Sequence, residues 1–180
     1  DDDGDTAYDV AIGSGLDDEA EILKNFMDIY RVQRINRRRI TRNRVKTLKI
    51  ARNAGLELCT GGIIGLGETR KQREELIFEI SELEPEEVTV NMLVPMPGTP
   101  LELQTQLDIT EILRVFSTLR FLLPESIIKI SGGREVNLKD DGQKLLVSGA
   151  NGIISAGYLT MGGNTIKKDT EMINELNLET

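Results

Sequence analysis

Cys59, the segment Gly65–Glu68, Asn91 and Arg134 are the parts of this sequence whose residue types could do chemistry. Cys59 is the only cysteine, and the stretch from it to Glu68 holds four of the seventeen glycines. A thiolate can bind a metal, and glycines let a ligand approach the backbone. Asn91 interrupts an apolar run, and an arginine such as Arg134, after two glycines, commonly binds a carboxylate or another anion.

The composition excludes several classes of function. The 180 residues include no histidine, which excludes Ser-His-Asp triads, imidazole bases and the usual zinc or haem ligation. A net charge of −8 argues against general affinity for nucleic acid. No apolar run approaches the roughly 20 residues of a membrane span, and no signal peptide is visible. A single cysteine fits a reducing cytoplasm, where we expect the protein to reside.

Alternating patterns predict the elements that position these residues. Strands are expected at 56–64, 88–94, 126–130 and 152–156, and helices at 41–54, 69–83, 108–123, 142–148 and 166–176. Strands that alternate with helices indicate an α/β fold with a parallel sheet. Together with a weaker strand–helix unit at 7–31, this pattern predicts four to five βα units, or part of a TIM-type (β/α)₈ barrel. Function in such barrels lies at the carboxyl ends of the strands, to which the sequence assigns the polar residues above.

Each of these residues also has a structural interpretation. A buried cysteine usually packs as a small hydrophobic residue. The glycines around Gly65 and Gly67 match neither a dinucleotide fingerprint nor a phosphate loop. Asn91 could make a structural hydrogen bond or contact a ligand, and Arg134 could be a surface cation. The patterns leave both alternatives open.

An arginine-rich stretch divides the chain into residues 1–40 and 41–180. The first part has an acidic tail, and seven arginines follow within fourteen residues, from Arg31 to Arg44. Such a stretch could bind nucleic acid or an acidic surface, which salt-dependent binding to a polyanion would test. In an acidic chain we favour a solvated or non-native junction instead.

From about Arg44 to Leu178 the sequence resembles the biotin synthase family of radical S-adenosylmethionine enzymes. The resemblance rests on Cys-Thr-Gly-Gly from Cys59, Asn-Met-Leu-Val from Asn91 and Gly-Tyr-Leu-Thr from Gly157. It implies the C-terminal half of a barrel that inserts sulfur into dethiobiotin to give biotin, with S-adenosylmethionine, a 4Fe-4S cluster and a 2Fe-2S cluster as cofactors.

The resemblance also implies a role for individual residues. Cys59 matches a ligand of the 2Fe-2S cluster, and Arg134 matches that cluster's arginine ligand. Asn91 matches a dethiobiotin contact, and Arg44 matches the partner of the cofactor's methionine carboxylate. The adenosine side of the cofactor would be lined by Gly65, Leu66, Gly67 and Glu68.

The sequence departs from the family in its cluster ligands. The Cys-x-x-x-Cys-x-x-Cys loop that holds the 4Fe-4S cluster is absent, as is the family's Tyr-Asn-His-Asn segment. Residues 7–31 weakly resemble an upstream strand–helix unit of the family, in which Asp9 would stand about where a second cluster cysteine is expected. We therefore expect a segment to be missing between about Arg31 and Thr41, through a deletion, a frameshift or a partial gene product.

Two other functions fit the same residues. A related radical enzyme, of the hydrogenase-cofactor maturase or methylornithine synthase type, would share most of these motifs. A truncated barrel without turnover would expose two sheet edges and should associate, with a homodimer as one possible form.

Overall fold

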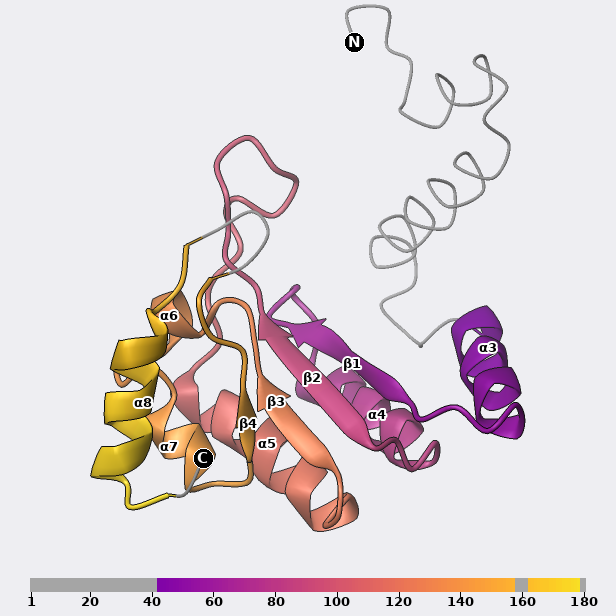
Figure 1. Cartoon of the computed structure of the whole chain (residues 1–180). Helices are drawn as coiled ribbons and strands as arrows, with labels where there is room; N and C mark the ends of the chain where they lie inside the picture. The colour runs from indigo at the N-terminus through magenta and orange to yellow at the C-terminus, as the bar shows by residue number, and fades with distance from the viewer. Residues whose placement is uncertain (1–41, 158–161, 179–180) are drawn as a thin grey trace, which may run out of the picture. The chain divides into compact units, whose positions relative to one another are not determined.

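The computed structural model describes residues 42–157 and 162–178. These residues form strands and helices that alternate along the chain (Figure 1). In chain order they are α3 (Arg42–Asn53), β1 (Cys59–Ile64), α4 (Arg70–Ser81), β2 (Glu87–Met92), α5 (Ile109–Leu122), β3 (Ile127–Ile130), α6 (Arg134–Asn137), α7 (Gln143–Leu146), β4 (Gly152–Ile153) and α8 (Ile166–Glu175).

The four strands are parallel and pair in the order β1-β2-β3-β4. This consecutive order is the one expected for neighbouring units of a (β/α)₈ barrel, so the predicted α/β class and parallel sheet are confirmed. The predictions for residues 1–40 and for Tyr158–Thr160 lie outside the described residues.

One face of the sheet carries the hydrophobic core. Along β2 the buried residues alternate, with Val88, Val90 and Met92 no more than 4% exposed. Figure 1 shows α4 and α5 on the same side of the sheet, and Ile80 and Phe116 bring their buried side chains to this layer. The intervening residues of each strand therefore lie on the opposite face, where the polar residues gather.

Local signals define the starts of the two helices that cover the sheet. The Thr69 side chain accepts the Gln72 backbone N–H, and the Gln72 side chain bonds back to Thr69, which completes a capping box. Asp108 accepts the Thr110 N–H and caps α5. Both helix starts were predicted from the sequence, and both are confirmed.

Three elements differ from the predicted pattern. The strand expected at 56–64 begins only at Cys59, and the one expected at 152–156 spans only Gly152–Ile153. Helix α6 was not predicted, because four residues show no periodicity. It begins after Gly133, whose φ of 89° and close approach to the Met92 carbonyl, 2.1 Å from where a Cβ would lie, both require glycine.

Candidate functional site

Cys59 and Asn91 lie on the same face of the sheet, away from the helices. Cys59 pairs with Glu87 across the β1–β2 ladder, and Asn91 lies four residues further along β2. Thr89 lies between Glu87 and Asn91 on β2, and it pairs with Lys129 of β3. Since paired residues share a face, the five side chains form a polar strip across three strands, which we call the sheet-face strip.

An ion pair between Glu87 and Lys129 dominates the charge of this strip. The hydrogen bond from Lys129 lowers the pKa of Glu87, with a smaller contribution from Cys59, and the same bond to Glu87 raises the pKa of Lys129. Cys59 is exposed, with its Sγ 3.9 Å from Thr89 Oγ1. Sequence reasoning missed Lys129, although a lysine alternating with apolar residues in Ile-Ile-Lys-Ile was a usable signal.

Asn91 makes a structural hydrogen bond and keeps a donor available. Its Oδ1 accepts the Gly132 backbone N–H at 3.1 Å, which ties the end of β2 to the loop after β3. No hydrogen bond of its Nδ2 occurs within the part of the chain that the structure describes. A structural hydrogen bond and a ligand contact are therefore both possible for Asn91, because Oδ1 bonds to the backbone while Nδ2 can donate to a ligand.

The turn from Gly65 to Glu68 follows β1 and is closed by its own glutamate. The Gly65 N–H donates to Glu68 Oε1 at 2.8 Å, and both Gly65 and Gly67 have φ near 90°. Arg73, on α4, donates to Glu68 Oε1 at 3.0 Å and to the Glu68 carbonyl at 3.1 Å. The turn therefore has a fixed shape that depends on Arg73.

Glu111 of α5 holds the other side of Arg73. Its Oε2 accepts from Arg73 Nη2 at 2.7 Å, and its Oε1 accepts from Arg70 and Arg114. The hydrogen bonds from Arg70 and then Arg73 lower the pKa of Glu111 to about 2. Neither Arg73 nor Glu111 was singled out from the sequence, because charged residues near helix starts are usually solvent-exposed.

Two glycines of β1 have a structural reason that the sequence did not reveal. A Cβ on Gly61 would lie 1.9 Å from the Thr89 carbonyl oxygen, and one on Gly62 would lie 3.1 Å from Leu76 Cδ2. The neighbouring strand and helix α4 occupy the space that the sequence analysis assigned to a ligand. Gly65 and Gly67 of the turn have structural reasons as well, because both have φ near 90° and a Cβ on Gly67 would lie 2.8 Å from Gln104 Oε1.

The structure does not bring Arg134 to Cys59. Cys59 begins β1 at the amino-terminal edge of the sheet, whereas Arg134 follows the carboxyl end of β3. The Arg134 side chain is 0% exposed, and its Nη2 donates to Asp169 Oδ2 at 2.6 Å. Its surroundings are those of an internal ion pair, and the cation of the sheet-face strip is Lys129.

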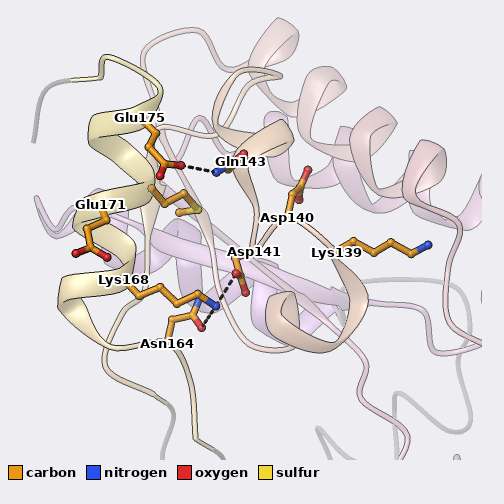
Figure 2. A pocket seen from close by; sticks show the side chains of 9 residues that line it. Lys139, Asp140, Asp141, Gln143, Asn164, Lys168, Glu171 and Glu175 are labelled. Carbon is orange, nitrogen blue, oxygen red and sulfur yellow. Dashed lines mark hydrogen bonds and ion pairs between the residues drawn. The ribbon is translucent and has the colours of Figure 1, made fainter.

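Arg44 lies in the first turn of α3 and is exposed. A separate hollow of about 300 Å³, between the α6–α7 region and α8, contains none of the residues that the sequence predicted for the site (Figure 2). In it, Lys168 forms an ion pair with Asp141 and a hydrogen bond with Asn164.

The described residues do not fit a complete iron–sulfur site. Residues 42–157 and 162–178 contain no group of three or more His, Cys, Asp or Glu side chains that could hold a metal ion. Cys59 supplies one thiolate, whereas a cluster takes about four ligands. Over the same residues, no helix is long and apolar enough to cross a membrane.

Curated proteins named biotin synthase resemble most of this chain. The one from Nitrosopumilus maritimus is 69% identical over 137 residues, which are 76% of this chain and 42% of that protein. The one from Cenarchaeum symbiosum is 61% identical over 137 residues, and the one from Carboxydothermus hydrogenoformans is 42% identical over 136. Each match covers 76% of this chain and 42–43% of the relative. The chain thus spans less than half the length of these relatives.

A family model agrees with these relatives. The model of the Biotin and Thiamin Synthesis associated domain matches residues 89–179, which begin within β2 and include α5, β3, β4 and α8. The matched range and the sequence identity together show the family to which the chain belongs. The chain belongs to the Biotin and Thiamin Synthesis associated domain family and corresponds to the C-terminal region of biotin synthase.

Proposed function

We propose that this chain provides the C-terminal part of a biotin synthase-type active site, in which dethiobiotin is converted to biotin. The observation that carries the proposal is the sheet-face strip, which puts the Cys59 thiol and the Asn91 amide on one face of adjacent strands. A relative that is 69% identical over 137 residues of the chain is named biotin synthase. That name favours biotin formation over the chemistry of related radical enzymes.

Two side chains of the strip have roles that their surroundings support. Cys59 is exposed, so its thiolate can ligate iron without a rearrangement of the sheet. The Asn91 Nδ2, which has no hydrogen bond among the described residues, can donate to an oxygen of dethiobiotin while Oδ1 stays bonded to Gly132. We assign Lys129 as the cation beside the thiol, because the Arg134 guanidinium is buried and forms an ion pair with Asp169.

The turn from Gly65 to Glu68 is the proposed contact for the adenosine part of S-adenosylmethionine. The contact would be made at Gly67, which is exposed, whereas Gly65 is buried and shapes the turn through its N–H bond to Glu68. Arg44, exposed on α3, is the proposed partner of the cofactor's methionine carboxylate, because a guanidinium can pair with a carboxylate through two hydrogen bonds.

Iron–sulfur clusters and S-adenosylmethionine would supply the radical and sulfur chemistry of such a site. This sequence has one cysteine, so any cluster at Cys59 must take its other thiolates from outside the sequence. The chain's own contribution is one ligand, a substrate donor and a rigid cofactor turn.

Cluster reconstitution in a chimera tests the ligand role. The 137 matched residues of this chain would replace their counterparts in the Nitrosopumilus maritimus relative, and iron and absorbance would be measured after anaerobic loading with iron and sulfide. We expect the chimera to hold about six irons, as the sum of a 4Fe-4S and a 2Fe-2S cluster. Its Cys59→Ala variant should hold about four, whereas full 2Fe-2S absorbance in that variant would exclude Cys59 as a ligand.

A further inference from the structure

We infer that Arg73 and Glu111 are positioning residues that hold the Gly65–Glu68 turn in the shape needed to bind the nucleoside of the cofactor. The inference rests on the proposed function, because it takes this turn as the cofactor contact. It adds two residues, from two different helices, that the sequence did not indicate.

The hydrogen bonds of Arg73 form a closed loop through the turn. Its Nη1 reaches both the side chain and the backbone carbonyl of Glu68, at 3.0 and 3.1 Å. The same Glu68 oxygen accepts the Gly65 N–H. A displacement of Arg73 therefore releases both ends of the turn at once.

The Arg73 side chain is only 7% exposed, so its charge needs partners on both sides. Glu68 provides one at 3.0 Å, and Glu111 provides the other at 2.7 Å from Nη2. A planar guanidinium can bridge two carboxylates in this way, whereas a lysine ammonium has a single nitrogen.

Arg73 is the only cation that forms an ion pair with Glu68 among the described residues. Its side chain is 15% exposed, and its second oxygen, Oε2, is enclosed without a hydrogen bond in the described structure. Without Arg73 the carboxylate would be left with the Gly65 N–H alone, and we expect it to turn toward water. Gly65 and Gly67 would then lose the conformation that the turn imposes.

Glu111 also contacts two exposed arginines, which provide a matched control. Arg114 donates to the Glu111 oxygen that Arg73 does not use, and its side chain is 41% exposed. Arg114→Ala removes a contact with the same carboxylate and leaves Arg73 between its two partners.

Calorimetric titration of the 180-residue chain with S-adenosylhomocysteine, an unreactive analogue of the cofactor, tests the inference. Arg73→Lys cannot bridge both carboxylates with a single nitrogen, and Glu111→Gln removes the negative partner of Arg73, so each should weaken binding by about tenfold. Arg114→Ala should stay within about twofold. All titrations are run well below the measured Tm of each variant, so that a loss of stability alone does not change Kd.

The outcomes separate the inference from the proposed function. Binding by the original chain together with weakened binding by both variants supports the positioning role. Binding by the original chain that both variants retain within about twofold overturns the positioning role and leaves the proposed function intact. No binding by the original chain overturns the proposed cofactor contact and the positioning role with it.

Discussion

Arg134 Nη2 lies 2.6 Å from Asp169 Oδ2, and the two side chains are 0% and 3% exposed. Ser155 donates to the same Asp169 oxygen at 2.5 Å, and Arg134 Nη1 donates to the Asp141 carbonyl at 2.8 Å. These bonds connect the start of helix α6 to helix α8 and to the segment that follows β4. Arg134 therefore has an architectural role, at a position that the family resemblance connected with iron.

Removal of one member of this ion pair should be costly. Arg134→Gln leaves the Asp169 carboxylate buried without its cation, and breaking a buried pair in this way costs about 3–5 kcal/mol. Ser155→Ala, which removes a single hydrogen bond to the same carboxylate, should cost about 1 kcal/mol. Urea unfolding of both variants measures the difference, and an Arg134→Gln variant as stable as the Ser155→Ala variant would contradict it.

Gly61 should tolerate no side chain. A methyl group there would overlap the Thr89 carbonyl, 1.9 Å away, so Gly61→Ala must push β1 and β2 apart. We expect it to lower the free energy of unfolding by about 1–3 kcal/mol or more. Gly162→Ala is the control, because nothing lies within 4 Å of its added Cβ. Equal stabilities of the two variants would show that β1 and β2 do not approach each other closely at Gly61 and Thr89.

The stability supplied by Glu111 should depend on pH in a defined direction. Its pKa is lowered from an ordinary value of 4.5 to about 2, so the folded protein favours the ionised form. This contribution is fully present above about pH 4.5 and is lost as the pH falls through about 2. The difference in unfolding free energy between the original chain and Glu111→Gln should therefore shrink as pH falls from 6 to 2. A difference that stays constant with pH would refute the depressed pKa.

The capping box at Thr69 gives a local test of helix α4. Thr69→Ala removes the acceptor for the Gln72 N–H and should cost about 1 kcal/mol, whereas Thr69→Ser should keep most of the stability. Thermal unfolding followed by circular dichroism compares the two. Similar losses in both variants would mean that the hydroxyl does not cap the helix.

Cys59 should react without unfolding. Its side chain is exposed on the sheet-face strip, so iodoacetamide should alkylate it in the folded chain at a rate close to that in denaturant. Mass spectrometry of timed samples measures both rates. Protection of the thiol until the protein unfolds would place it in a closed environment and contradict the exposed face.

The sequence predicted the elements that have strong local signals. Thr69 and Asp108 precede apolar helical patterns, and Pro124 cannot continue a helix, so the bounds of α5 were close to those observed. The parallel sheet followed from the alternation of strands and helices. These signals depend on neighbours in the chain, which is why one sequence suffices to find them.

Contacts between distant residues could not be predicted in this way. Arg73 and Glu111 are 38 residues apart, and Arg134 and Asp169 are 35 apart. A charged residue is usually solvent-exposed, so no local sequence signal indicated that these residues would form ion pairs shielded from solvent. The steric requirement for glycine at position 61 likewise comes from the backbone of another strand, β2.

Biotin formation by the chimera with the Nitrosopumilus maritimus relative tests the central claim most directly. After cluster loading, the chimera would be incubated with dethiobiotin, S-adenosylmethionine and a reductant, and biotin would be measured by mass spectrometry. We predict biotin from the chimera and none from its Cys59→Ala variant, with intermediate yields from Asn91→Ala. A chimera that holds both clusters and forms no biotin, or a Cys59→Ala variant that forms as much as the chimera, would contradict the proposed role of this chain.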